Sequence, residues 1–139
     1  QEIIYCKDNT KLKEVVKDLI DRYGEFPTVL KNFVKIIILR NMAQNLGISK
    51  IIENKSEYVK NIVNIHITEE FDINKVELLI KKYKTRINFK KSKDIDEKGI
   101  IEYKYKDPER KIEEIHSFLN ILKLGIIKER DNIRKEEEK

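Results

Sequence analysis

Apolar positions at helical spacing predict two helices in the first third of the chain. The first runs to about Tyr23, and Asn9 or Thr10 is expected to cap its start. Its apolar face comprises Leu12, Val15, Val16, Leu19, Ile20 and Tyr23. The second helix is predicted from about Pro27 to Leu46. Its apolar stripe widens in the middle, which predicts contacts on more than one side. Its expected core face comprises Leu30, Phe33, Val34, Ile37, Met42 and Leu46.

A sharp corner is predicted between these two helices. Gly24 stands where a helix commonly ends in a residue with left-handed backbone. Pro27 stands where the next helix can begin, because the first helical residues do not need their N–H groups. By the same reasoning, Gly47 is expected to end the second helix.

The remainder of the chain alternates between strand and helix patterns. Short alternating runs predict strands over residues 48–54, 62–67, 85–89 and 100–105, with a charged loop over residues 90–98. The element order is helix, helix, strand, strand, helix, strand, strand, helix. Paired strands between helices favour an α+β fold of two layers, in which helices pack on an antiparallel sheet of about four strands.

Two further helices are predicted from their capping residues. Asp72 is expected to cap a helix whose core face comprises Ile73, Val76, Ile80 and Tyr83. Asp107-Pro108 is expected to start the last helix, which Gly125 ends. Its core face comprises Ile112, Ile115, Phe118, Leu119 and Leu122. Residues 1–127 are thus expected to form a single domain with a core drawn from all four helices. The charged tail over residues 128–139 is expected to be a frayed helix or disordered.

Composition narrows the class of protein. A chain of 139 residues fits one domain and is long enough to form a stable hydrophobic core without disulfides or structural metal ions. The single cysteine, Cys6, excludes an intrachain disulfide and favours a reducing compartment. No apolar run approaches the roughly 18–20 residues that a membrane span needs, and no signal peptide is recognisable. We therefore expect a cytoplasmic protein that makes no membrane contact.

The net charge of +5 raises nucleic-acid binding as an alternative function. Most of the 30 basic residues are lysines, and acidic residues are interleaved with them along nearly every segment. Lysine lacks the planar fork with which arginine recognises phosphates and bases. A solvated surface of mixed charge is therefore favoured, and a Lys-rich nucleic-acid-binding module remains the alternative.

Sequence motifs for catalysis, cofactors or metals are not recognisable. The four glycines are isolated, whereas a phosphate-binding loop needs them clustered before a helix. His66 and His116 have no histidine or cysteine at ligand spacing, and Cys6 has no base near it in the sequence. We expect no catalytic site, no metal site and no cofactor in this domain.

Acidic residues form a stripe on the first helix, opposite its apolar face. Glu14, Asp18 and Asp21 are spaced by four and three residues. Taken alone, the stripe favours a solvated surface, because Asp18 can pair with Arg22 along the helix.

Residues 18–48 resemble a known protein family. A helix that ends in Asp-Leu-Ile-Asp-Arg-Tyr-Gly, followed by a Pro-initiated helix and Leu-Gly-Ile, is similar to the C-terminal (TRCF) domain of bacterial transcription-repair coupling factors (Mfd). The resemblance continues more weakly to about Leu122, while the family's Tyr-Lys-Lys-Ile segment upstream of the first helix is not visible. Because the chain begins with Gln1, we expect a piece of a longer protein.

The resemblance implies a function exerted through partners. In this family a DNA-translocating ATPase displaces stalled RNA polymerase and recruits the excision-repair protein UvrA. The C-terminal domain packs on a UvrB-like N-terminal domain of the same protein and covers its UvrA-binding surface. The implied role is therefore a non-catalytic, autoinhibitory lid that competes with UvrA. DNA and RNA polymerase would contact other domains, and the isolated domain is expected to be a monomer.

The family pattern also implies which residues make the contact between the two domains. Asp18 and Asp21 match the two family acids that face basic residues of the N-terminal domain. The first of these is usually Glu in the family, so Asp18 is one methylene shorter. Glu14 has no counterpart in the pattern and is a second-tier candidate.

Overall fold

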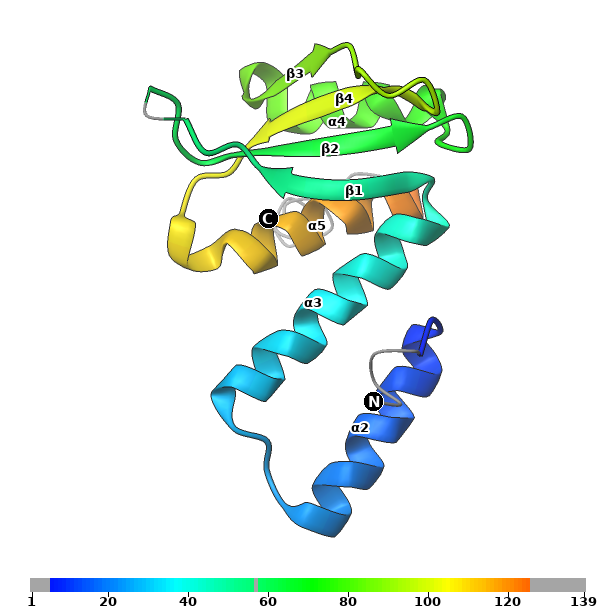
Figure 1. The fold of residues 1–139 in the computed structure, drawn as a ribbon, viewed down its shortest axis with the longest axis vertical. Helices are drawn as coiled ribbons and strands as arrows, with labels where there is room; N and C mark the ends of the chain where they lie inside the picture. The colour runs from blue at the N-terminus through cyan, green and yellow to red at the C-terminus, as the bar shows by residue number, and fades with distance from the viewer. Residues whose placement is uncertain (1–5, 57, 126–139) are drawn as a thin grey trace, which may run out of the picture.

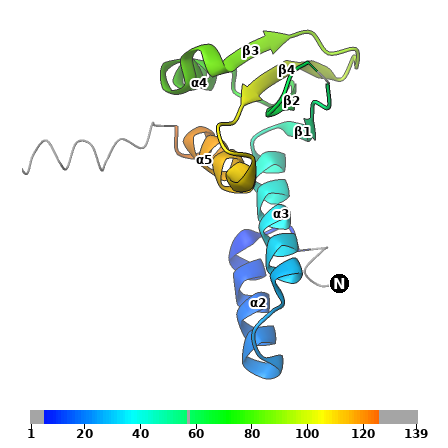
Figure 2. The same cartoon turned by 90° about the vertical axis from the view of Figure 1, so that its left-hand side faces the viewer.

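A four-stranded sheet and a projecting helical hairpin make up the fold in a computed structural model that describes residues 6–56 and 58–125. The hairpin consists of α2 (Asn9–Tyr23) and α3 (Thr28–Asn45), and it extends away from the sheet (Figures 1 and 2). The other elements are β1 (Ile48–Glu53), β2 (Ile62–Thr68), α4 (Val76–Tyr83), β3 (Ile87–Lys90), β4 (Glu97–Lys104) and α5 (Lys111–Leu124). The predicted α+β class and its order of elements are confirmed.

The sheet has the strand order β1-β2-β4-β3, and every neighbouring pair is antiparallel. Val63, Ile65 and Ile67 of β2 are buried against the helices, as period-two alternation predicts. The expectation of a loop over residues 90–98 is wrong at both ends. Lys90 pairs with Ile100 and Glu97 pairs with Thr68, because backbone pairing extends the strands although their side chains are charged.

The main core lies between the sheet and the helices that cover one of its faces. It joins the C-terminal half of α3 to α4, α5 and the inner face of the strands. Three rings pack at its centre: the Tyr83 and Tyr103 centroids are 4.8 Å apart, and those of Tyr103 and Phe118 are 4.9 Å apart. The predicted core residues Ile115, Phe118, Leu119 and Leu122 of α5 are buried.

The hairpin has a separate and much smaller apolar cluster. Leu12, Val34 and Ile37 form its buried centre. Leu39, by contrast, belongs to the main core, so the widened stripe of α3 contacts two sides as predicted. The expectation of one core drawn from all four helices is wrong for α2. This helix projects beyond the sheet, and Leu12 is its buried residue.

Several predicted helix ends shift by one residue. The side chain that caps α2 is Asp8, which accepts hydrogen bonds from the backbone of Thr10 and Lys11. Pro27 is the capping residue before Thr28 rather than the first helical residue. Gly24 ends α2 with a φ of 88°, but its ψ of −177° lies outside the left-handed helical region.

The predicted core face of the third helix is partly wrong. Asp72 caps the segment as expected, and Tyr83 is buried. Ile73 and Ile80, however, are 53% and 49% exposed, while Leu79 is buried. Residues 73–75 form a 3-10 turn, which has three residues per turn, so Ile73 is out of phase with the α-helical face that follows. The predicted core residue Phe33 of α3 is also 40% exposed, because α2 covers only one side of α3.

Gly47 joins α3 to β1 at a point where no side chain fits. Its φ is +82°, and a Cβ there would lie 2.5 Å from the Phe71 nitrogen. Gly24 has a similar φ of +88° but open space around it.

We expect Gly47→Ala to lower the free energy of unfolding more than Gly24→Ala does. Backbone strain costs about 1–3 kcal/mol at either glycine, and overlap with the 70–71 backbone should add about 1–3 kcal/mol at Gly47 alone. Urea unfolding of the two variants measures the difference. Equal losses would show that the backbone of residues 70–71 moves away without cost.

Candidate functional site

The predicted acidic stripe lies on the solvent side of α2. Glu14, Asp18 and Asp21 are all exposed. The Asp18 Oδ2 atom is 3.3 Å from the Arg22 Nε atom, and these side chains are 57% and 66% exposed. Exposed pairs of this kind contribute little to stability. The structure therefore places Asp18 and Asp21 on one accessible face, one helical turn apart.

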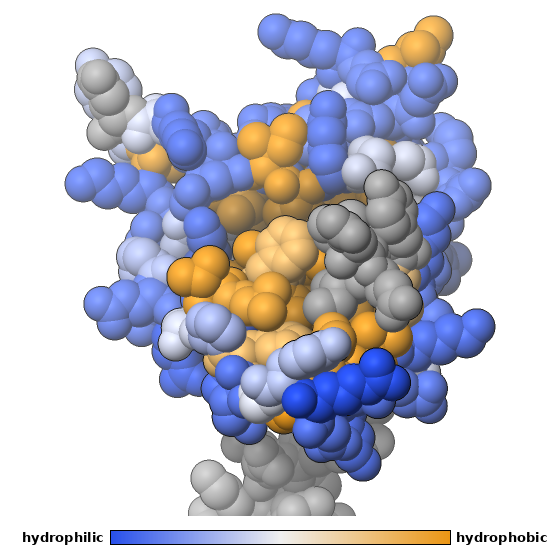
Figure 3. Space-filling model, turned by 60° about the horizontal axis from the view of Figure 1, so that its bottom comes forward, coloured by the Kyte–Doolittle hydropathy of each residue, from blue (hydrophilic) through white to orange (hydrophobic). Residues whose placement is uncertain are grey.

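An apolar hollow lies between the two helices of the same hairpin. It has a volume of about 330 Å³. Leu12, Val16, Ile20, Val34 and Ile38 line it, together with Lys13 and Lys17. Figure 3, which brings the free end of the hairpin forward, shows apolar side chains gathered in the middle of this face with charged residues around them.

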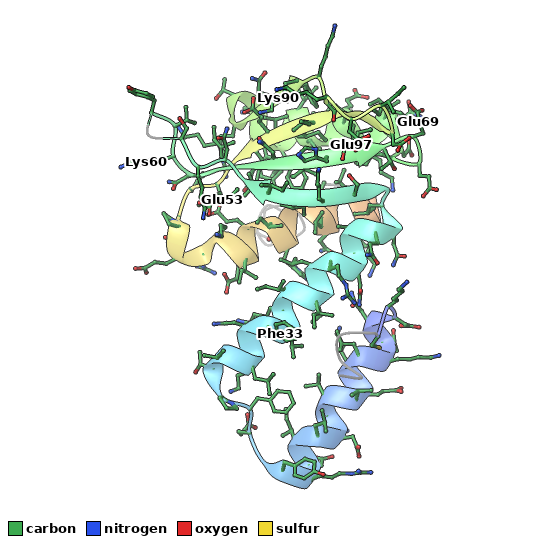
Figure 4. The ribbon with its side chains drawn as sticks, in the orientation of Figure 1. Phe33, Glu53, Lys60, Glu69, Lys90 and Glu97 are labelled. Atoms are coloured by element: carbon green, nitrogen blue, oxygen red, sulfur yellow. The ribbon has the colours of Figure 1, made fainter. Side chains whose placement is uncertain are left out.

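Other large apolar side chains of the same hairpin remain exposed. Tyr23 and Val29 near the corner are 79% and 82% exposed, and Phe33, labelled on α3 in Figure 4, is 40% exposed. A hairpin of two helices offers each helix one neighbour, which cannot cover the whole apolar face of α2. A contiguous apolar patch with a charged rim is typical of a surface that contacts another protein unit.

A polar network that sequence reasoning missed lies on the sheet near the start of β4. The Glu97 side chain, labelled in Figure 4, is 4% exposed. It accepts hydrogen bonds from Ser92 (2.5 Å) and Ser49 (2.7 Å), and its other short contact is 2.7 Å to Nδ1 of His66. These residues are up to 48 positions apart in sequence, so no local motif could have revealed them.

The pKa of Glu97 reflects this network. Burial alone raises the pKa of a carboxyl group, but the hydrogen bonds from Ser92, His66 and Ser49 outweigh it and lower the pKa to about 2. The group therefore stays ionised at neutral pH, and its bonds tie the 91–96 loop to β1 and β2.

A second network joins the start of α5 to the sheet. Glu114 accepts hydrogen bonds from Arg86 and Tyr103, each at 3.1 Å, and from the backbone of Lys106 and Asp107. Burial alone raises the pKa of Glu114, but the two backbone donors and the other partners outweigh burial, so the pKa lies below its usual value. Burial also raises the pKa of Tyr83, to about 12. The carboxylate is surrounded by donors, which suits a structural role.

The remaining candidates for chemistry lie apart from one another. His66 contacts Glu97, His116 lies exposed on α5, and Cys6 is half-buried beside the start of α2. Among residues 6–56 and 58–125, no group of three or more His, Cys, Asp or Glu side chains is arranged to hold a metal ion. No helix in this part of the chain is both long and apolar enough to cross a membrane.

We expect Glu97→Gln to lower the free energy of unfolding at pH 7 by about 1–3 kcal/mol, because the charge that strengthens three hydrogen bonds is lost. The folded pKa lies below the unfolded value, so the wild-type advantage is complete above about pH 4.5 and disappears as the pH falls toward 2. Urea unfolding at pH 7 and pH 3 should show the two proteins converging. Glu109→Gln, which changes an exposed carboxylate, is the control. If the difference in unfolding free energy between wild type and Glu97→Gln is the same at pH 3 as at pH 7, the pKa of Glu97 is not lowered by the network.

Comparison with protein families identifies residues 1–75 as a TRCF domain. Curated proteins gave no match to the chain. The matched residues contain the α2–α3 hairpin with the acidic stripe, both strands β1 and β2, and the glycine that joins α3 to β1. They cover more than half of the 139 residues. The chain therefore belongs to the TRCF domain family, the domain found in transcription-repair coupling factors.

Proposed function

We propose that this TRCF domain is a non-catalytic regulatory domain of a coupling factor. It packs on the UvrB-like N-terminal domain of the same protein and masks the surface that binds UvrA. The observation that carries the proposal is the exposed pair Asp18 and Asp21 on the projecting hairpin. The resemblance described above matches these two residues to the family's contact acids.

Electrostatics favours a basic partner for this face. Asp18, Asp21 and Glu14 present three carboxylates along one side of α2, where solvent reaches all of them. The pair between Asp18 and Arg22 is more than half exposed, so a cation of the partner can replace Arg22 at small cost. Charges at the edge of a contact mainly set orientation and association rate.

Apolar contact supplies the second part of the argument. The hollow between α2 and α3 and the uncovered Tyr23, Val29 and Phe33 lie on the same hairpin as the acids. The hollow lies on the opposite side of α2 from the acids, so it offers a second, separate contact surface to the parent protein. Both surfaces belong to the hairpin, so contacts there leave the sheet and its core unchanged.

Autoinhibition follows from competition for one surface. Because the lid and the masked domain belong to one chain, their contact is intramolecular and has a high effective concentration. The lid must still be able to separate from the masked domain, so the closed state should be favoured over the open state by only a few kcal/mol. UvrA would then bind when an event elsewhere in the parent protein weakens the contact. The ATPase, DNA and RNA polymerase sites belong to other domains in this proposal.

We expect Asp18→Lys combined with Asp21→Lys to open the lid without unfolding the domain. Both residues lie off the buried face, so each should change the free energy of unfolding by about 0.5 kcal/mol or less. Against a basic surface, the reversed charges turn attraction into repulsion. Full-length parent protein carrying both changes should bind UvrA more tightly, while the melting temperature of the isolated domain stays the same.

A matched control separates this effect from a general change of charge. Glu69→Lys with Glu70→Lys reverses two exposed acids in the loop after β2, away from the acidic stripe of α2, and should leave UvrA binding unchanged. Equal UvrA affinity in both double variants would refute the lid. Tight binding of the isolated domain to duplex DNA, falling with salt at a slope near −0.9 per phosphate contact, would instead support the Lys-rich nucleic-acid-binding module.

A further inference from the structure

Strand β1 forms a free edge of the sheet. The backbone N–H of Asn54 donates to Ile62 of β2, and Thr68 of β2 donates to Gly47. Because antiparallel strands alternate between bonded and non-bonded pairs, the backbone groups of Ile51 and Glu53 point away from β2. The described residues supply no hydrogen-bond partner for these outward groups. An extended chain could pair with them as an additional strand.

An apolar groove lies directly beside this edge. It has a volume of about 400 Å³ and runs between β1, α3 and α5; these three elements meet below the sheet in Figure 1. Its apolar lining comprises Ile36, Leu39, Ala43, Ile48, Ile51, Ile112 and Ile115. Ile36 is 52% exposed there, although it lies mid-helix in α3. The groove therefore offers apolar surface next to unpaired backbone.

The rim of the groove carries an excess of positive charge. Arg40, Lys50 and Lys111 line it. Lys111 is 3.4 Å from Glu53, whereas the hydrogen bonds of Arg40 go to the neutral oxygens of Asn41 and Cys6. Lys50 is exposed and forms no ion pair with any described residue. Of these cations, Lys50 is the one that stands on the edge strand itself and lacks a carboxylate partner among the described residues.

We propose that the β1 edge and this groove bind an extended peptide segment in which apolar residues alternate with acidic ones. Such a segment would add a fifth strand beside β1. Successive side chains of a strand point to opposite faces, so its apolar residues would enter the groove beside Ile51. Its acidic residues would lie on the other face of the sheet, toward Lys50. This surface is distinct from the acidic stripe of α2.

A second copy of this chain fits the edge less well than an acidic peptide. Two β1 edges would bring two copies of Lys50 together, and a lysine on an edge strand is a common barrier to self-pairing. The strand also has an irregular register between Ile48 and Lys50, which limits the length of edge that a rigid partner strand could follow. A flexible peptide can adapt to such an edge.

The test uses the full 139-residue chain and three labelled synthetic peptides of eight residues that alternate Ile or Val with Asp or Glu. Fluorescence anisotropy should show binding by at least one peptide, and its Lys-for-acid analogue should bind at least tenfold more weakly. In the complex, the backbone amides of Ile51 and Glu53 should become protected from hydrogen exchange.

Paired variants locate the binding surface. Ile36→Glu and Lys50→Glu should each weaken binding at least tenfold. Ile73→Glu and Lys81→Glu, which alter side chains of the same type that are exposed elsewhere, should not. If Ile36→Glu lowers the melting temperature, Lys50→Glu alone tests whether the peptide binds at this edge, because Lys50 is exposed and its replacement should not affect folding.

Three results would overturn the proposal. One is the absence of binding by all three peptides at millimolar concentration. Another is binding that Lys50→Glu leaves unchanged. The third is concentration-dependent dimerisation without peptide that Ile36→Glu abolishes, which would make a second copy the occupant.

Discussion

Helix α3 is the element on which the rest of the structure depends, because its two halves belong to two different apolar clusters. Val34 and Ile37 pack against α2, while Leu39, Met42 and Ala43 pack into the core beneath the sheet. A single rigid helix therefore sets the direction in which the hairpin projects. The site on α2 and the groove beside β1 both take their geometry from α3, although they lie at different ends of it.

The start of α2 is attached to α3 by polar contacts as well as by the apolar packing of Leu12. Asn41 is 1% exposed and donates to the backbone oxygen of Cys6 and to the side chain of Asn9. Arg40 donates to the same Cys6 oxygen. A buried amide that is fully bonded fixes one arrangement of the helices, because any shift would leave its polar atoms without partners. The position of the acidic stripe thus rests on a few directed bonds.

The sequence predicts the elements of this fold better than their contacts. Alternating apolar and polar residues predicted β2 and β4, and capping residues such as Asp72 and Asp107 predicted where helical segments start, because these signals lie within a few residues of the element. The 3-10 turn over residues 73–75 and the exposure of Phe33 depend on what packs nearby. The network around Glu97 joins residues from four separate segments, and no spacing rule connects them. The acids of α2 were accessible to sequence reasoning because one helical face carries all three.

The uneven division of buried surface gives the two parts of the molecule different local stabilities. Within the described chain, Leu12 is the single α2 residue that is shielded from water. Separating α2 from α3 therefore exposes far less apolar surface than disrupting the sheet does, and its free-energy cost lies well below that of global unfolding. The helix that carries the acidic stripe can open as a local unit while the sheet remains folded. A partner that binds α2 in its closed position would spend part of its binding free energy on ordering that helix against α3, which lowers its affinity.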